Sequence, residues 1–331
     1  MLNKELRDIA KMLVIDGKGI LAADESTATT GKRFAGIGVD NTEDNRRAYR
    51  ELLFTAPEME KYISGVIMYD ETIKQVDDDV FLVDLLKSRG VIPGIKVDQG
   101  LKDFEGSTVE KITTGLDDLN KRLKEYYSLG ARFAKWRAVF SIGDDLPSEK
   151  CVKANAEILA KYAKACQDNY IVPIVEPEVL MNGSHTIEQC YDVTVRVLMD
   201  VFLELKKENV DLSGMLLKPN MVIGSLEGPE TTSGQIAEST LKCLSSVVPT
   251  EVPGIVFLSG GQSEEEACEN LNAINQLAKN VPWKLTFSYG RALQNSALQT
   301  WAGKKENVVR AQKVFVERAK AASLASQGKM I

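Results

Sequence analysis

The sequence predicts a single α/β domain over residues 1–331, built as a (β/α)8 TIM barrel with extra terminal helices. Eight short, β-branched apolar runs recur along the chain, and each is followed by a longer segment with helical periodicity. No long linker or break in composition divides these units, which favours one barrel. A doubly wound open sheet is the alternative, but it would usually carry a glycine-rich loop after its first strand. The segment DESTAT at 24–29 has none.

The predicted strands follow one another in order along the chain. They are GILAAD at 19–24, GVIMYD at 65–70, PGIKVD at 93–98, RFAKWR at 132–137, IVPIVEP at 171–177, GMLLKPN at 214–220, GIVFLSG at 254–260 and KLTFSYG at 284–290. Amphipathic segments between them include 151–169, 186–209 and 264–280. Ser263 and Glu266 have the spacing of a capping box at the start of the last of these helices.

Two further segments complete the predicted elements. Residues 1–14, MLNKELRDIAKMLV, alternate charged and apolar residues as an amphipathic helix would, without the apolar core of a signal peptide. Residues 223–235, IGSLEGPETTSGQ, are expected to form an exposed loop after the sixth strand.

A single histidine among 331 residues restricts the chemistry that this chain can perform. A Ser-His-Asp hydrolase would have to use His185, and a zinc site with two or three histidine ligands cannot be assembled. We expect His185 to be a surface or capping residue without a catalytic role. The five cysteines are scattered without a CxxC pair, which predicts reduced, mostly buried thiols in a cytosolic protein. Catalysis should therefore depend on lysines, carboxylates and hydroxyls.

The charge balance also limits the partners. A formal net charge of −6 argues against a nucleic-acid surface, because binding to a phosphate backbone needs clustered basic charge. A locally positive pocket for a small anion is still compatible with an acidic protein. No apolar run reaches the roughly 18 residues of a membrane span. The scattered, reduced thiols lead us to expect a cytoplasmic protein.

Charged residues gather at the carboxyl ends of the predicted strands, where barrels of this class place their active sites. They are Asp24, Lys96, Asp98, Lys135, Arg137, Glu176, Glu178 and Lys218. One such residue alone could be a solvated surface charge, but the set predicts a site. Several lysines at one mouth should lower one another's pKa and so yield a neutral amine nucleophile. A neutral lysine beside a carboxylate suits Schiff-base chemistry on a ketone or aldehyde.

Glycine-bearing segments follow the seventh and eighth strands, LSGGQ at 258–262 and SYGR at 288–291. Loops in these positions commonly bind phosphate, although tight turns alone could explain the glycines. The segment DESTATTGKR at 24–33 supplies Ser26, Thr29, Lys32 and Arg33, which could hold a second phosphate or simply cap and flank a helix. Two phosphate sites around one lysine–carboxylate centre would suit a sugar with phosphate at both ends.

Eight segments carry a family resemblance through almost the whole chain. They are GKGILAADEST (17–27), NRRAYRELLFTAP (45–57), PGIKVDQGL (93–101), GARFAKWRAV (130–139), IVPIVEPEVL (171–180), LLKPNMV (216–222), FLSGGQSEEEA (257–267) and FSYGRALQ (287–294). In this order they resemble class I fructose-1,6-bisphosphate aldolase. The resemblance implies a glycolytic and gluconeogenic lyase that reversibly splits fructose 1,6-bisphosphate into dihydroxyacetone phosphate and glyceraldehyde 3-phosphate, with no metal or other cofactor.

The resemblance also implies catalytic roles for individual residues. Lys218 in LLKPN would form the Schiff base, and Glu176 in VEPE would serve as acid/base when the carbinolamine loses water. Glu178 would position Lys135 or the proton relay. Asp24 would take the proton from the C4 hydroxyl as the C3–C4 bond breaks, while Lys135 holds charge and geometry.

The same resemblance implies two phosphate contacts. The C1 phosphate would lie against Ser259, Gly260, Gly290 and Arg291. The other phosphate would face Ser26, Thr29, Arg33 and Lys96. The substrate-binding set that we expect is completed by Arg137, Gly261 and Ser288.

Two features depart from the family pattern. Ala28 stands where glycine is common and Thr29 where serine is also common, which should tune phosphate binding and leave the chemistry alone. The sequence ends in SLASQGKMI, whereas the family normally continues as a mobile tail whose terminal tyrosine assists proton exchange at the enamine. If such a tail beyond Ile331 is absent, cleavage should survive and turnover through the enamine should slow.

The resemblance implies a homotetramer and leaves alternative functions open. The family binds actin and other cytoskeletal or membrane-associated partners through its cationic cleft, so a scaffold role is one alternative. Schiff-base chemistry on another phosphorylated ketose, such as fructose 1-phosphate or sedoheptulose 1,7-bisphosphate, is a second. Substrate should compete with a scaffold partner, because both need the same positive pocket.

Overall fold

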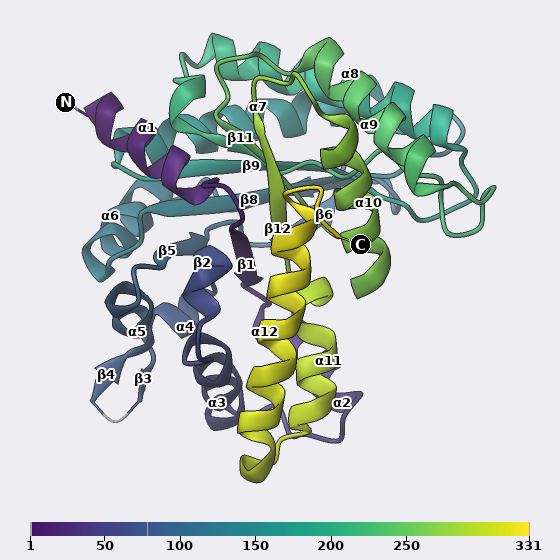
Figure 1. Cartoon of the computed structure of the whole chain (residues 1–331). Coiled ribbons are helices and arrows are strands. Elements are labelled where there is room, and N and C mark those ends of the chain that lie inside the picture. Colours follow the sequence, from purple (N-terminus) through teal and green to yellow (C-terminus); the bar gives the residue numbers. More distant parts are fainter. Residues whose placement is uncertain (1, 78, 331) are drawn as a thin grey trace.

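Eight parallel strands close into a barrel in the computed structural model, which describes residues 2–77 and 79–330 (Figure 1). Their order around the barrel is β1-β12-β11-β10-β9-β8-β5-β2. The strands are β1 (Gly19–Ala23), β2 (Ile63–Met68), β5 (Ile92–Lys96), β8 (Phe133–Phe140), β9 (Val172–Val179), β10 (Leu216–Leu217), β11 (Gly254–Phe257) and β12 (Lys284–Tyr289). Each strand overlaps the apolar run predicted for it, so the (β/α)8 class is confirmed and the open sheet is wrong.

Helices surround this barrel (Figure 1). They are α1 (Leu2–Leu13), α2 (Thr27–Ala35), α3 (Glu43–Phe54), α4 (Asp70–Lys74), α5 (Leu82–Ser88), α6 (Leu119–Leu129), α7 (Glu149–Asp168), α8 (Ile187–Lys207), α9 (Ser233–Val247), α10 (Glu264–Leu277), α11 (Arg291–Trp301) and α12 (Val308–Ala325). The capping box predicted for Ser263 and Glu266 is present at the start of α10. None of the helices within the described residues is both long enough and apolar enough to cross a membrane.

Two short antiparallel hairpins were not predicted. One pairs β3 (Val76–Asp77) with β4 (Val80–Phe81), and the other pairs β6 (Leu101–Asp103) with β7 (Lys111–Thr113). Their strands have only two or three residues, which is too short for a period-two pattern to stand out in the sequence.

Glycines let large side chains fill the lower part of the barrel. A Cβ atom added at Gly94 would lie 2.3 Å from the ring of Phe133, and one at Gly65 would lie 2.9 Å from it. Helix α1 closes the amino end of the barrel, because Leu6, Ile9, Ala10 and Leu13 belong to one buried cluster with the lower barrel side chains. Side chains alternate along each strand, so the residues two and four places beyond Phe133 point into the upper barrel.

Two expectations about the chain's surface need correction. His185 is buried, with 5% of its surface exposed, and Thr186 caps α8 instead. The carbonyl of His185 accepts hydrogen bonds from the N–H and the hydroxyl of Ser225 in the loop over residues 223–232. Burial lowers the pKa of His185.

The loop expected over residues 223–235 is only partly exposed, because Ser225 and Gly224 are buried, and α9 already begins at Ser233.

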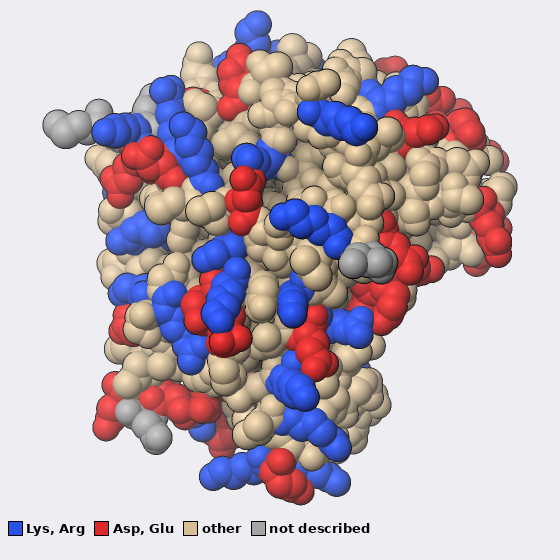
Figure 2. Space-filling model, viewed as in Figure 1, with Lys and Arg blue, Asp and Glu red and all other residues tan. Residues whose placement is uncertain are grey.

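The cysteines follow the prediction more closely. All five cysteines are free and buried. Figure 2 shows basic and acidic side chains interspersed over the face that carries α1 and α12. Buried charged side chains gather instead inside the barrel mouth.

Candidate active site

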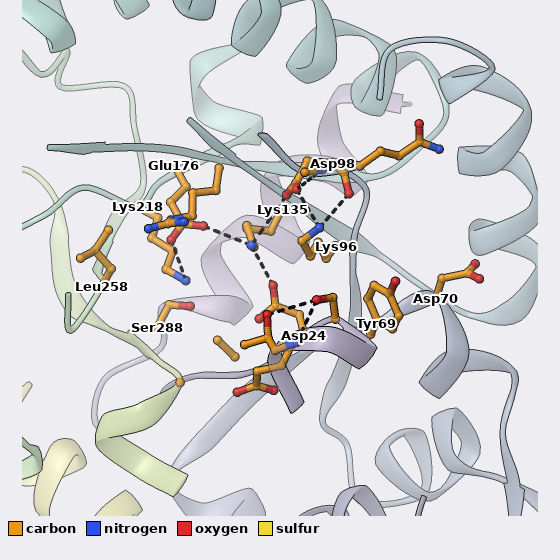
Figure 3. Close-up of a pocket in the computed structure, with 18 of the residues that line it drawn as sticks. Asp24, Tyr69, Asp70, Lys96, Asp98, Lys135, Glu176, Lys218, Leu258 and Ser288 are labelled. Carbon is orange, nitrogen blue, oxygen red and sulfur yellow. Dashed lines mark hydrogen bonds and ion pairs between the residues drawn. The ribbon is translucent and has the colours of Figure 1, made fainter. Parts of the chain in front are cut away.

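A pocket of about 850 Å³ opens at the carboxyl ends of the barrel strands (Figure 3). All of the predicted site residues except Gly261 line it: Asp24, Ser26, Thr29, Arg33, Lys96, Lys135, Arg137, Glu176, Glu178, Lys218, Ser259, Gly260, Ser288, Gly290 and Arg291. Residues up to 267 positions apart in the sequence therefore meet at one mouth. Barrel closure produces this, since it brings the ends of all eight strands onto one ring.

Lys135 occupies the centre of this pocket and contacts carboxylates from three other strand ends (Figure 3). Its Nζ atom lies 2.7 Å from Asp24 Oδ2, 3.5 Å from Glu176 Oε2 and 3.9 Å from Asp98 Oδ2. Only 5% of the Lys135 side chain is exposed. This lysine follows Phe133 by two positions on β8, which directs it inward above the apolar part of the barrel.

The expected mutual lowering of lysine pKa values is wrong for Lys135. Burial opposes its charged form, but Asp24, Glu176 and Asp98 outweigh burial and raise the pKa of Lys135 above its ordinary value. Burial would likewise raise the pKa of Asp24, but Lys135 and Lys218 outweigh it and lower that pKa to about 2. Lysines and carboxylates interleave at this mouth, so each stabilises the charged form of the other.

Lys218 lies directly after β10 and faces Glu176. Its Nζ atom is 3.2 Å from Glu176 Oε1, so the two oxygens of Glu176 lie between Lys218 and Lys135. The backbone N–H of Lys218 donates to the carbonyl of Val175, which extends the pairing of the short β10 with β9. Only 5% of the Lys218 side chain is exposed.

Asn220 strengthens the connection between these two strands. Its amide oxygen accepts a hydrogen bond of 3.0 Å from the backbone N–H of Val179, and its amide nitrogen donates to Thr194. A buried side chain thus supplies a contact beyond the last paired residue of β10. The contact fixes the segment that carries Lys218 against the strand that carries Glu176.

Glu178 contacts Arg137, whereas we expected it to position Lys135 or the proton relay. Its Oε2 accepts a hydrogen bond from Arg137 Nε. Burial opposes the charged form of Arg137, but the adjacent Glu178 outweighs it and raises the pKa of this guanidinium. Arg137 lies two residues beyond Lys135 on β8, and Glu178 lies two residues beyond Glu176 on β9, so both occupy the next inward position of their strands. The pair therefore forms the next layer of the mouth.

The loops after β11 and β12 meet on one side of the pocket. Arg291, the first residue of α11, donates to the carbonyl of Gly260, whose φ of 56° lies in the left-handed region. Ser288 is 1% exposed, and its hydroxyl has no protein partner among the described residues. Gly261 lies outside the pocket lining, and its N–H donates to the sulfur of Met181.

Helix α2, the first helix after β1, lies on another side of the pocket. Ser26 caps α2, because its hydroxyl accepts from the N–H of Thr29, and both hydroxyls also line the pocket. Ser26 therefore both caps α2 and lines the pocket. Arg33 is paired with Glu25, whereas Lys32 is exposed and does not line the pocket. Lys96 Nζ lies 2.7 Å from Asp98 Oδ1.

Sequence reasoning assigned no role to several residues that build this site. Glu25 pairs with Arg33 and Arg50, and it accepts a hydrogen bond from Gln294. Burial would raise the pKa of Glu25, but the two arginines outweigh it and lower that pKa. The sequence indicated Asp98 as a charged residue at a strand end, two positions after Lys96. Arg50 and Gln294 lie inside helices, where no local pattern distinguishes them from packing residues.

The pocket offers cationic and hydroxyl groups for anions and two lysines for carbonyl chemistry. Within residues 2–77 and 79–330, no group of three or more His, Cys, Asp or Glu side chains is arranged to hold a metal ion.

Comparisons with known proteins all lead to one family. The family model described as glycolytic, fructose-bisphosphate aldolase class-I, matches residues 5–331. A probable fructose-bisphosphate aldolase class 1 of Xanthomonas axonopodis pv. citri is 52% identical, with 98% of each chain covered. The cytosolic fructose-bisphosphate aldolase 4 of Arabidopsis thaliana is 57% identical over 94% of this chain and 80% of its own.

A solved structure is similar over the whole chain. It is fructose-bisphosphate aldolase of Plasmodium falciparum, in a ternary co-crystal with TRAP and a small-molecule inhibitor. Its TM-score is 0.98 at 51% sequence identity, and the match covers 100% of this chain and 96% of that one.

Proposed function

The chain belongs to the class I fructose-bisphosphate aldolase family, and we infer from this that it is a lyase that reversibly cleaves fructose 1,6-bisphosphate. The products are dihydroxyacetone phosphate and glyceraldehyde 3-phosphate. One observation carries the mechanism: a buried lysine, Lys218, lies 3.2 Å from a carboxylate that a second buried lysine also contacts. The remaining steps are proposals about the residues around that pair.

We propose that the sugar lies across the mouth with a phosphate at each side. The C1 phosphate would contact Ser259, Gly260, Ser288, Gly290 and Arg291. The hydroxyl of Ser288, which has no partner within residues 2–77 and 79–330, supports this placement, since such a buried hydroxyl gains a hydrogen bond when an anion binds. The second phosphate would contact Ser26, Thr29, Arg33 and Lys96. Arg137 would hold the sugar between the two phosphates.

Schiff-base formation would begin when the unprotonated amine of Lys218 attacks the C2 carbonyl. The resulting carbinolamine must lose water, and Glu176 can protonate the departing hydroxyl because its Oε1 lies 3.2 Å from Lys218 Nζ. Lys135, whose raised pKa keeps it charged at 3.5 Å from the other oxygen of Glu176, can hold that carboxylate in place and stabilise it once its proton has left. The iminium then withdraws electrons from the C3–C4 bond, which supplies the electron sink without a metal.

Cleavage requires a base for the C4 hydroxyl proton, and Asp24 is placed for that role. Its pKa is lowered to about 2, which makes it a weak base. Phosphate dianions at Lys96 and beside Lys218 would offset the positive field that holds this pKa down. We therefore expect substrate binding itself to make Asp24 more basic. Glu178, paired with Arg137, would position the guanidinium and take no proton.

Borohydride trapping tests the mechanism. Dihydroxyacetone phosphate with borohydride should leave a reduced adduct on the peptide that contains Lys218, identified by mass spectrometry. Lys218→Met should lose both the adduct and turnover. Lys96→Met is the matched control, because it removes another pocket lysine and should still be trapped on Lys218. Turnover that survives in Lys218→Met, or that disappears with a chelator, contradicts the mechanism.

Substrate preference is a separate measurement. Turnover of fructose 1,6-bisphosphate should exceed that of fructose 1-phosphate, because only the bisphosphate carries the second phosphate. That phosphate is the proposed ligand of Ser26, Thr29, Arg33 and Lys96. Sedoheptulose 1,7-bisphosphate keeps both phosphates and tests the length of the pocket. Equal kcat/KM for fructose 1-phosphate would contradict the second phosphate site.

A scaffold role is a second candidate, supported by the Plasmodium falciparum structure in complex with TRAP. We propose that an anionic cytoskeletal or adhesin-type partner, such as actin or its adaptors, uses the same cationic mouth. Saturating fructose 1,6-bisphosphate should then displace the partner in a pull-down. Binding that is unaffected by substrate would contradict a shared site.

Assembly and location are further proposals. We propose that residues 1–331 act as a single domain and that four copies form a homotetramer, which a sedimentation measurement tests. We also propose a cytoplasmic location, because the Arabidopsis thaliana relative is named as a cytosolic protein. A fluorescent fusion in the native cell would report it.

A further inference from the structure

We propose that Met181 is a positioning residue for the substrate phosphate and a site of reversible oxidation by peroxide. The inference rests on the proposed function, since it assumes that the loop over residues 259–261 holds a substrate phosphate. Met181 lies two residues beyond β9, the strand that carries Glu176 and Glu178. Its side chain connects the end of that strand with the loop after β11.

The contact between Met181 and this loop is direct. The Sδ atom of Met181 accepts a hydrogen bond from the N–H of Gly261 at 3.0 Å. A Cβ atom added at Gly261 would lie only 2.8 Å from the same sulfur. The thioether therefore occupies the space that any side chain at Gly261 would need. Gly260, the next residue toward the pocket, accepts the hydrogen bond from Arg291.

The backbone of Met181 is held as firmly as its side chain. The carbonyl of Met181 accepts a hydrogen bond of 3.0 Å from the N–H of Leu226, and Leu180 donates to the carbonyl of Phe140 at the end of β8. These bonds fix the backbone that carries the thioether, so the sulfur can move only by rotation within its own side chain. A change at the sulfur should therefore alter its contact with the 259–261 loop.

Oxidation would be such a change. Hydrogen peroxide transfers an oxygen atom to the thioether, so the sulfur is oxidised to a sulfoxide and the peroxide is reduced to water. A sulfoxide oxygen that lay between the Met181 sulfur and the Gly261 nitrogen would need to be about 2.9 Å from the nitrogen to accept its hydrogen bond. The length of the S–O bond adds to that distance. The present 3.0 Å between the sulfur and the nitrogen has no room for both. An oxygen on any other side of the sulfur adds bulk to a side chain that already touches Gly261.

Exposure to solvent distinguishes Met181 from Met221, which also lies near the 259–261 loop. Met181 is partly exposed and lines a second cavity of about 440 Å³, between residues 223–233 and the start of α10. Met221, which lies near Gln262 of the same loop, is 1% exposed and shielded. Met12 and Met199 are more exposed, at 50% and 58%, but they lie on α1 and α8 and do not line the active-site pocket. Peroxide should oxidise them without an effect on turnover.

The test compares full-length wild-type enzyme with Met181→Leu and Met199→Leu before and after hydrogen peroxide. In the wild type, KM for fructose 1,6-bisphosphate should rise roughly tenfold as sulfoxide accumulates at Met181, the scale of one weakened hydrogen bond to a charged group. The value of kcat should fall much less, because Lys218 and Glu176 do not move. Methionine sulfoxide reductases that act on both epimers should restore KM, while dithiothreitol alone should not.

The two variants separate the methionines. Met199→Leu should respond to peroxide as the wild type does. Met181→Leu keeps the volume but lacks the sulfur, so its KM, raised a few-fold from the start, should not rise further with peroxide. Fully oxidised Met181 with unchanged KM, or a Met181→Leu enzyme as sensitive as the wild type, would overturn the inference. An untreated enzyme without aldolase activity would instead refute the proposed function.

Discussion

The two ends of the barrel interior follow the same strand geometry and differ in every chemical respect. At the amino end, Phe133, Val172 and Ile174 pack with helix α1 into a buried apolar cluster. At the carboxyl end, the next inward positions on the same two strands carry Lys135 and Glu176. The lower end supplies stability through burial, and the upper end holds charges whose burial is tolerated only because each has a partner.

The difference shows how one alternating pattern can serve two tasks. An inward position on a barrel strand is either packed by neighbours or open to the mouth, and only its height in the barrel decides which. Substitutions at the two ends should therefore fail in different ways: the upper end should lose activity, and the lower end should lose stability.

The largest effect is expected for Glu176→Gln at the upper end. An amide cannot exchange the proton that the carbinolamine step needs, so kcat should fall by roughly 10²- to 10⁴-fold. The rate of borohydride trapping should fall in parallel. Glu204→Gln, at a buried carboxylate on α8, is the control and should keep its kcat. A Glu176→Gln enzyme with wild-type kcat would show that the carboxylate is not the acid/base.

Phe133→Ala tests the lower end. Removing this fully buried ring beside Gly65 and Gly94 leaves a cavity, so the free energy of unfolding in urea should fall by about 3–5 kcal/mol. The kcat of the folded enzyme should change far less than in Glu176→Gln. Val309→Ala, at a position 78% exposed, should change stability by less than about 0.5 kcal/mol. Loss of activity without loss of stability in Phe133→Ala would contradict the division between the two ends.

The stability contributed by the upper end should depend on pH. The pKa of Asp24 is lowered from 3.8 to about 2 in the folded protein, which corresponds to about 2 kcal/mol of stability. That stability is present above about pH 4 and is lost as the pH falls toward 2, because the folded state then binds the proton that it had excluded. The stability difference between wild type and Asp24→Asn, measured in urea, should shrink over this window. A difference that stays constant from pH 6 to pH 2.5 would contradict the shift.

The smallest effect is expected for a charged pair outside the barrel interior. Lys284 and Asp16 are 2.7 Å apart but 57% and 76% exposed, so water screens their attraction. Lys284→Ala should lower the free energy of unfolding by no more than about 1 kcal/mol and leave kcat unchanged. A larger loss, or one that salt does not reduce, would show that this surface pair contributes as a buried one does.

Local patterns were sufficient for the fold and for the charged residues that gather at the barrel mouth. Eight apolar runs separated by helical segments predict a parallel sheet covered by helices, and eight such units without a glycine-rich loop after the first strand favour a closed barrel over an open sheet. The charges at the ends of those runs predict a mouth with Lys135, Glu176 and Lys218, because strand ends of a barrel share one ring. Neither inference needs knowledge of which side chain touches which.

The contacts within the mouth were decided by the tertiary structure alone. Lys135 contacts three carboxylates and so has a raised pKa, although a count of nearby lysines predicted the opposite. Glu178 contacts Arg137, and Met181 supports a loop that is 80 residues away in the sequence. His185 is buried although its neighbours in the sequence indicated a surface position. The physical reason is that a sequence pattern sets the side of a strand to which a residue points, while Coulomb and packing energies depend on distances that only barrel closure establishes.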